Sequence, residues 1–145
     1  MSPAAEFAYR VSAAARSRAS WLQLLKFSIV GGSGYLVNLV VFAALADKLG
    51  VHHAIAAVGA FCVAVTNNFL WNRYWTFGPG EGKASFQAAR FLTVSVLSLA
   101  LNLAVLEAIL AGTSIGELSA QAIAVAAVMP FNFLGNKLWT FADGA

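Results

Sequence analysis

The chain of 145 residues has very little charge, because Asp, Glu, Lys and Arg together make up only 10% of it. A soluble globular protein carries about 25% charged residues, so the composition excludes an ordinary soluble domain. Cysteine is also scarce: Cys62 is the only one, so no disulfide can form within the chain. We expect this thiol to be buried in a helix as a small apolar residue. The low charge indicates an integral membrane protein.

Apolar sequence is abundant instead, with 60% hydrophobic residues and a mean hydropathy of +0.75. A helix that spans a bilayer needs about 20 mostly apolar residues. Stretches without an acidic or basic residue cover 27–46, 49–72, 91–106 and 118–136. They predict an all-α membrane protein with four transmembrane helices, near 24–46, 52–72, 88–111 and 117–137. The third of these helices includes Glu107.

Basic residues gather on one side of the predicted helices. Arg10, Arg16, Arg18 and Lys26 precede the first helix, Arg73, Lys83 and Arg90 lie between the second and third, and Lys137 closes the fourth. Of the 9 basic residues, only Lys48 falls on the other side. Loops in the cytoplasm carry an excess of Lys and Arg, so we expect both termini and the 73–90 loop to be cytoplasmic. Beside four spans, attraction to anionic lipid explains the basic arm better than nucleic-acid binding.

The chain contains an internal repeat. The segment NNFLWNRYWTF at 67–77 returns as FNFLGNKLWTF at 131–141, 64 residues later and without a gap. Upstream, Gln23, Lys26, Phe27 and Asn38 match Gln87, Arg90, Phe91 and Asn102. Each repeat is a pair of helices that returns the chain to its starting side, so the sequence predicts parallel repeats related by an axis along the membrane normal.

The repeat divides the chain into four parts. Residues 1–22 form a basic N-terminal arm, for which an interfacial helix and a disordered segment both remain open. Residues 23–77 are the first repeat, 78–86 a cytoplasmic linker rich in glycine, and 87–141 the second repeat. The small residues Gly31 to Gly34 permit close helix contact, and we expect a homo-oligomer, most simply a dimer.

Each repeat ends in the same amides and one cation. They are Asn68, Asn72 and Arg73 in the first repeat, and Asn132, Asn136 and Lys137 in the second. The amides of each pair are four residues apart and share a helix face. Two roles remain open for them: hydrogen bonds between helices, worth about 1 kcal/mol or less each, and contact with a lipid headgroup. The cations either fix topology at the helix ends or bind phosphate, which suits a cation beside two amides.

Other polar and aromatic residues recur beside these motifs or deeper in the helices. Trp75 and Trp139 fit the aromatic belt at the interface, while stacking on a sugar ring stays open. Asn38 and Asn102 lie 12 residues past Lys26 and Arg90, about 18 Å deep at about 1.5 Å per residue. They either pair with each other or line a polar path. Glu107 either belongs to this path, as an acidic residue inside a span, or reaches outer water.

The sequence offers no support for catalysis. It contains no Ser/His/Asp or Cys/His arrangement and no pair of carboxylates at a working distance in sequence. The linker GPGEGKASF resembles a phosphate-binding loop in composition only, because the spacing of a Walker motif fails. His52 and His53 lack a wider ligand cluster, so we expect no metal. We therefore predict a protein that is not an enzyme and has no cofactor.

The pattern from Lys26-Phe27 through Gly34 to Asn38, with the endings Asn-Phe-x-x-Asn-Arg/Lys-x-Trp-Thr-Phe, resembles the GtrA-like family over roughly 23–141. These are small bacterial inner-membrane proteins linked to cell-surface polysaccharide synthesis. The resemblance implies handling of polyprenyl-phosphate-linked sugars and movement of such a lipid between leaflets. It makes Asn68, Asn72, Arg73, Trp75 and their repeat partners the candidate headgroup site. Lys137 in place of Arg73 puts the equivalence of the two copies in doubt.

Three functional hypotheses follow. The first is a translocator of polyprenyl-phosphate sugars in the bacterial inner membrane, driven downhill by consumption of the lipid outside. The second is a membrane scaffold that recruits a glycosyltransferase to its lipid substrate. The third is an exporter of hydrophobic cations, which is disfavoured because no acidic residue lies deep in the first, second or fourth helix.

The charge distribution predicts the topology of the chain. In a Cys62→Ala background, single cysteines at Ser2, Lys83 and Gly144 should resist an impermeant thiol reagent in intact cells and react after permeabilisation. A cysteine at Ser114, in an outer loop, should react without permeabilisation. Labelling of any of the first three positions in intact cells would contradict the predicted orientation.

Overall fold

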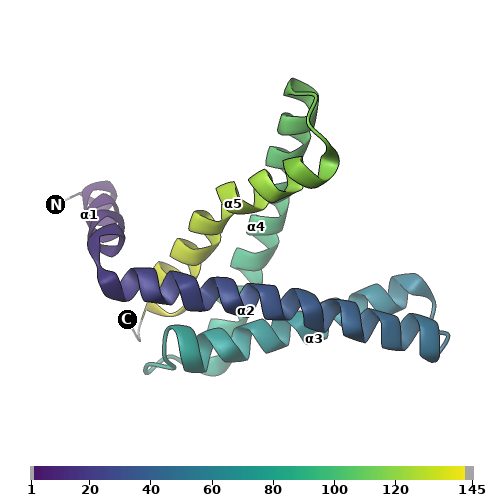
Figure 1. The fold of residues 1–145 in the computed structure, drawn as a ribbon. Helices are drawn as coiled ribbons and strands as arrows, with labels where there is room; N and C mark the ends of the chain where they lie inside the picture. The colour runs from purple at the N-terminus through teal and green to yellow at the C-terminus, as the bar shows by residue number, and fades with distance from the viewer. Residues whose placement is uncertain (1, 143–145) are drawn as a thin grey trace. The chain divides into compact units, whose positions relative to one another are not determined.

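The computed structural model describes residues 2–142, so the predicted cytoplasmic C-terminal end at 143–145 lies outside the described residues (Figure 1). The described chain is helical and contains no strand. Its α-helices are α1 (Pro3–Arg16), α2 (Arg18–Ala43), α3 (His53–Trp71), α4 (Ala84–Gly112) and α5 (Glu117–Gly135). Three π-helices extend them: η1 (Ala44–Lys48) follows α2, η2 (Asn72–Thr76) follows α3, and η3 (Asn136–Thr140) follows α5.

Four helical segments within residues 2–142 are long and apolar enough to cross a bilayer. They are Arg18–Lys48, His53–Thr76, Ala84–Gly112 and Glu117–Thr140. The prediction of an all-α protein with four transmembrane helices is confirmed. The segments run beyond the predicted spans because the apolar pattern marks only the part inside the hydrocarbon, while the helices continue into the interface.

The connection between the second and third spans is shorter than the predicted linker. α4 begins at Ala84, inside the segment 78–86. Pro79 and the glycines at 78, 80 and 82 interrupt the helix, and Gly78 and Gly80 have φ of 86° and 55°. From Ala84 onward no Gly or Pro follows for a full turn, so helix formation resumes there.

The chain divides into two compact units, Met1–Gly78 and Pro79–Ala145. In the first unit α2 and α3 lie side by side, and in the second α4 and α5 do so (Figure 1). We call α2 to η2 the first hairpin and α4 to η3 the second hairpin. Each hairpin is a pair of antiparallel helices joined by a short turn, 49–52 in the first and 113–116 in the second.

The two hairpins bury the same sequence positions. On the first helix of each, the buried residues are Phe27, Val30 and Gly34, matched by Phe91, Val94 and Ser98. On the second, they are Ala56, Ala60 and Ala64, matched by Ala120, Ala124 and Val128. Spacing by four places the second set on one helix face. Small residues let helix backbones approach closely where lipid gives no hydrophobic driving force, so alanine stripes hold both hairpins together.

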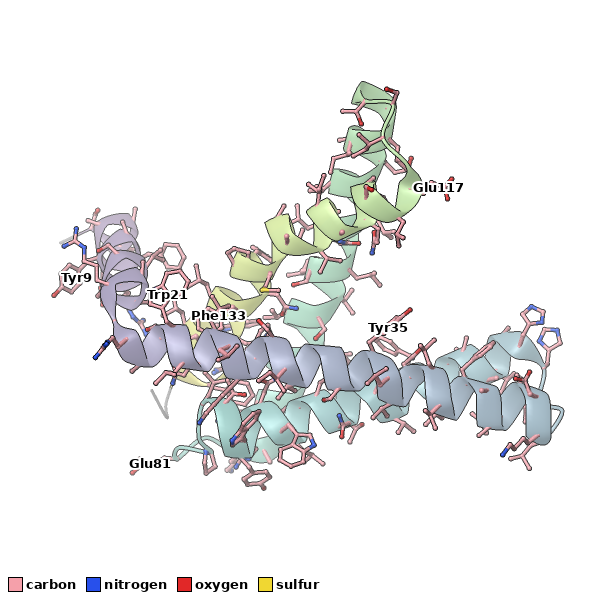
Figure 2. All side chains as sticks on the ribbon, in the orientation of Figure 1. Tyr9, Trp21, Tyr35, Glu81, Glu117 and Phe133 are labelled. Carbon is pink, nitrogen blue, oxygen red and sulfur yellow. The ribbon has the colours of Figure 1, made fainter. Side chains whose placement is uncertain are left out.

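The outward faces carry large apolar side chains. Tyr35 projects from α2 away from α3, and it is exposed, as are Leu36 and Val40 on the same helix (Figure 2). In a membrane these faces contact lipid, which explains how a chain with so few buried residues is stable. The prediction that Cys62 is buried is wrong, because its side chain is exposed on α3. The buried stripe of α3 is built from Ala60 and Ala64, and Cys62 lies between them on the other face.

The N-terminal arm is helical. The Oγ of Ser2 accepts a hydrogen bond from Ala5 N at 3.3 Å, and Pro3 stands at the start of α1, as at many helix N-termini. The indole N–H of Trp21, at the start of α2, donates to Ala15 O at 3.0 Å (Figure 2). This bond holds the bend between α1 and α2. The position of α1 at a membrane interface stays a prediction.

The glycines of α2 differ in surroundings. A Cβ at Gly31 or Gly32 would meet nothing within 4 Å, whereas a Cβ at Gly34 would overlap the amide of Asn68 on α3. Gly34 therefore makes room for a contact between the two helices of the first hairpin. Gly31 and Gly32 remain open on the surface of the described chain, and the predicted homo-oligomer stays a prediction.

The alanine stripe predicts that size matters on one face of α3 only. Ala60 is fully buried, so Ala60→Leu should overpack the hairpin and destabilise it by about 1–3 kcal/mol. Ala57 lies on the exposed face of the same helix, and Ala57→Leu should be neutral. Heat stability in detergent, followed by loss of the monodisperse size-exclusion peak, compares the two. Equal melting points would mean that the stripe does not hold the hairpin.

Candidate functional site

Both duplicated motifs end their helix in a π-turn. The N–H of Phe77 donates to Asn72 O at 2.9 Å, and the N–H of Phe141 donates to Asn136 O at 2.9 Å. π-turns are rare and occur frequently at functional sites. The third π-turn, η1, lies at the other end of the first hairpin and has no counterpart in α4. The shared feature is therefore a π-turn that carries the Asn, cation, Trp and Thr of the motif.

A cation from the first helix of each hairpin closes the end of the second. The Nζ of Lys26 donates to Trp75 O at 3.3 Å and lies 5.3 Å from the centroid of the Trp75 ring. The guanidinium of Arg90 donates to Trp139 O at 3.1 Å, with Cζ 5.7 Å from the Trp139 ring. The last carbonyls of a helix lack intrahelical donors, and a cation there also complements the helix dipole. We call each arrangement a cation–indole clamp.

The two clamps account for the contacts that the Trp75 and Trp139 rings make. Each indole has a cation over its ring, and Trp75 also meets Trp71 edge-on at 6.2 Å between centroids. Below each clamp a buried Phe pair closes the hairpin: Phe27 with Phe77 at 6.1 Å, and Phe91 with Phe141 at 6.3 Å. Both indoles remain 40% or more exposed, as belt residues are. Sugar stacking on them stays a prediction.

The sequence-based prediction did not include Lys26 and Arg90 in the candidate site, although the structure places both in the clamps at the polar ends of the hairpins. The available signal was the 64-residue match itself, because a cation recurs at the same position of both first helices. It also left out Thr76 and Thr140, which are buried at 5% and 0% exposure. These hydroxyls belong to the duplicated Trp-Thr-Phe ending.

In the second hairpin the two amides bond to each other. The Nδ2 of Asn136 donates to the backbone O of Asn132 at 2.9 Å and to its Oδ1 at 2.8 Å. Asn136 is completely buried. Asn132 Oδ1 is thus satisfied within one helix, whereas Asn136 Oδ1 and Thr140 Oγ1 are buried without a partner among residues 2–142.

In the first hairpin, no such bond joins the two amides in the part of the chain that the structure describes. Its Asn68 amide lies against Gly34 instead. Within residues 2–142, the buried atoms Asn68 Oδ1, Asn72 Oδ1 and Thr76 Oγ1 have no hydrogen-bond partner. A buried polar atom without a partner costs about 1–3 kcal/mol. The three oxygens without a partner at this hairpin end therefore need a physical explanation.

The cations of the motif follow these amides directly. Arg73 is buried, with 9% of its surface exposed, and its Cζ lies 5.6 Å from the Tyr74 ring. Lys137 is half-buried, with Nζ 5.8 Å from the Phe133 ring. Each hairpin end therefore holds one Arg and one Lys in exchanged places: Lys26 and Arg73 in the first, Arg90 and Lys137 in the second.

The deeper polar residues are less alike. Asn102 Oδ1 accepts a bond from Gln121 Nε2 at 3.3 Å, which joins α4 to α5. Asn38, its repeat partner, is half-buried on α2, and the residue matching Gln121 is Ala57. Glu107 is exposed on α4. The polar path predicted from Asn38, Asn102 and Glu107 stays a prediction, with Asn102 tied to its own hairpin.

The two histidines have a local role. His52 Nδ1 accepts a bond from Ala54 N at 3.3 Å and so caps α3, and its ring lies 4.2 Å from that of His53. Among the described residues, no group of three or more His, Cys, Asp or Glu side chains could hold a metal ion.

The fold and its duplicated polar ends define a small multi-pass membrane protein with four apolar helices. The chain belongs to the family described as GtrA/DPMS, transmembrane domain, which matches residues 26–141. It is similar to the uncharacterized membrane protein YngA of Bacillus subtilis, with 25% identity over 118 residues, covering 81% of this chain and 78% of YngA.

A second relative is a dolichol-phosphate mannosyltransferase of Pyrococcus furiosus. It is 47% identical over 55 residues, which are 38% of this chain but only 15% of that protein. The chain thus matches a small part of the archaeal protein.

The cation–indole clamp predicts the effect of removing one cation. Lys26→Met keeps the length of the side chain but removes the donor to Trp75 O and the cation over the ring, so heat stability in detergent should fall. Lys26→Arg should be tolerated, because Arg90 fills this position in the second hairpin. Lys83→Met, at an exposed loop position, is the matched control. The clamp is unimportant if Lys26→Met and Lys83→Met melt alike.

Proposed function

We propose that this protein binds polyprenyl-phosphate-linked sugars at the polar ends of its hairpins and carries them between leaflets for cell-surface polysaccharide or cell-wall synthesis. The observation that carries the proposal is the end of the first hairpin. There the buried Arg73 shares the π-turn η2 with Asn72 and Thr76, whose side-chain oxygens are buried without a partner among the described residues. Such a set offers both charge and hydrogen bonds to a polar headgroup.

The chemistry of the cation supports phosphate as one part of the ligand. A guanidinium presents a planar fork that matches phosphate oxygens, and its hydrogen bonds to an anion are about twice as strong as neutral ones. A charged group near the hydrocarbon is expensive and marks a functional site by default. Arg73 provides the fork in the first hairpin, and Lys137 provides a point charge in the second.

The surroundings support a lipid ligand. Large apolar residues cover the outside of the hairpins from end to end, so a prenyl chain can lie along them while its phosphate stays at the polar end. In this proposal the protein is a binder and translocator rather than an enzyme, it needs no cofactor, and it works in the bacterial inner membrane with both termini in the cytoplasm.

A scaffold role is the second candidate, and one observation favours it. A 55-residue part of this chain resembles a small part of a dolichol-phosphate mannosyltransferase. In the scaffold alternative, this chain provides the membrane part for a separate glycosyltransferase and presents the lipid to it without moving it.

Reconstitution separates the two candidates. The purified protein is placed in vesicles whose inner leaflet carries a fluorescent polyprenyl-phosphate glucose, and a membrane-impermeant quencher reports arrival in the outer leaflet. Translocation predicts faster loss of fluorescence than in protein-free vesicles, and Arg73→Gln should slow it. Unchanged transfer, together with copurification of a glycosyltransferase from native membranes, would favour the scaffold.

The motif cations predict the affinity for the lipid phosphate. A hydrogen bond to a charged group contributes about 1.5–3 kcal/mol, so Arg73→Gln and Lys137→Gln should each weaken binding on the order of tenfold to a hundredfold. Arg73→Lys should lose part of the affinity because the fork is lost. Lys137→Arg should be tolerated, since it restores the residue of the first repeat.

The measurement is the affinity for one polyprenyl phosphate in a single detergent, with Lys83→Gln as the control for a cytoplasmic charge outside the motif. If Arg73 and Lys137 only fix topology, each single change will be nearly silent and binding will persist. Unchanged affinity in both variants would remove the headgroup assignment and leave the scaffold ahead.

A further inference from the structure

The two hairpins agree in almost every contact at their polar ends. The π-turn, the cation–indole clamp and the buried Phe pair recur with nearly equal distances. One amide of each pair is the exception. Asn72 Oδ1 and Asn136 Oδ1 are alike, because both are buried without a partner among the described residues. Asn132 Oδ1 accepts a hydrogen bond from Asn136 Nδ2, whereas Asn68 Oδ1 has no partner there. The two ends therefore differ at the first amide of the motif.

A single difference on the first helix of each hairpin accounts for this. Position 34 is glycine, and the Asn68 amide occupies the space where a Cβ would be. The matching position is Ser98, which is buried at 6% exposure. A serine has a Cβ where glycine has none, so the Asn132 amide lacks the space that Asn68 uses, and it bonds to Asn136 on its own helix. Gly34 thus gives the Asn68 amide its place against α2.

The consequence is chemical. In the second hairpin the oxygen of Asn132 is satisfied by Asn136 Nδ2. In the first hairpin the oxygen of Asn68 stays open, and only a donor can satisfy it. The oxygens of a phosphodiester accept hydrogen bonds and donate none, so a phosphate alone leaves the oxygen of Asn68 unsatisfied. A hydroxyl both donates and accepts, and so matches an amide in either orientation.

We propose that Asn68 recognises a hydroxyl group of the sugar attached to the lipid phosphate, and that Gly34 positions it for this task. Asn132 is its structural copy. The proposal rests on the proposed function, since it assigns the sugar-reading part of the same site. It makes the first hairpin the one that distinguishes a glycosylated lipid from the bare polyprenyl phosphate.

The test compares two probes that differ in one group: a polyprenyl phosphate, and the same lipid as its glucosyl phosphodiester. Their affinities are measured in one detergent for two matched variants, Asn68→Ala and Asn132→Ala. The readout is the ratio of the two Kd values, relative to the ratio for the unchanged protein. This ratio cancels effects on phosphate or prenyl binding.

Losing one neutral hydrogen bond should cost the glucosylated lipid on the order of threefold to tenfold. We expect this loss for Asn68→Ala, with the bare lipid little affected. Asn132→Ala should keep the ratio and lower heat stability instead. The same change of ratio in both variants, or a change only in Asn132→Ala, would overturn the assignment.

Gly34 gives a second variant that leaves both amides in the chain. Gly34→Ala should displace the Asn68 amide and reduce the preference for the glucosylated lipid, while Gly31→Ala, on the open surface of the same helix, should not. A Gly34→Ala protein with an unchanged ratio would contradict the positioning role. This variant also keeps the test decisive if an Asn variant fails to fold.

Arg73→Gln, measured with both probes, separates the two levels of inference. If it weakens both lipids while no Asn variant alters the ratio, the phosphate site stands and the sugar-reading assignment fails. If neither lipid responds to Arg73→Gln or Lys137→Gln, the proposed function itself fails.

Discussion

Polar groups at the ends of spanning helices need partners, because the hydrocarbon beside them offers none. The structure meets this constraint with the same arrangement, the cation–indole clamp, at the end of each hairpin. A cation from the first helix of a hairpin donates to the carbonyl of the Trp in the closing π-turn and lies over its indole ring. The clamp fixes the end of the second helix, and the π-turn that it closes carries the second amide of the motif, the second cation and the Thr hydroxyl.

The helix packing serves the same end. Alanines at every fourth position bring the two helices of each hairpin close together, which is how small residues act where lipid supplies no hydrophobic force. Close packing lets Lys26 reach Trp75 and lets Asn68 lie against Gly34. The apolar outer faces are left to the lipid. Most of the sequence is thus interchangeable in detail, and the polar ends are where particular residue types are required.

Much of the fold could be predicted from the sequence. Stretches free of charge gave the four spans, and the match of 67–77 with 131–141 gave the repeat, because both signals are local and survive without knowledge of contacts. Burial was harder to predict. Cys62 is exposed, since in a membrane helix an apolar residue is as stable against lipid as against protein, and hydropathy alone does not choose the face.

The site was only partly predictable for a related reason. The Asn, Arg, Lys and Trp positions followed from the duplicated motif, but the clamp joins residues 49 positions apart through a π-turn. No sequence period reveals such a turn. Gly34 was read as a surface for another helix, yet its missing Cβ makes room for Asn68. That role depends on the register of α2 against α3, which only the structure supplies.

The most direct measurement is native mass spectrometry of the protein released from its own membrane in mild detergent, followed by fragmentation of whatever lipid stays bound. The account predicts an adduct that yields a polyprenyl phosphate and a sugar, and that is depleted in Arg73→Gln relative to Lys83→Gln. Adducts of ordinary phospholipids alone, equal in both variants, would contradict the claim that the duplicated polar ends recognise a lipid-linked sugar.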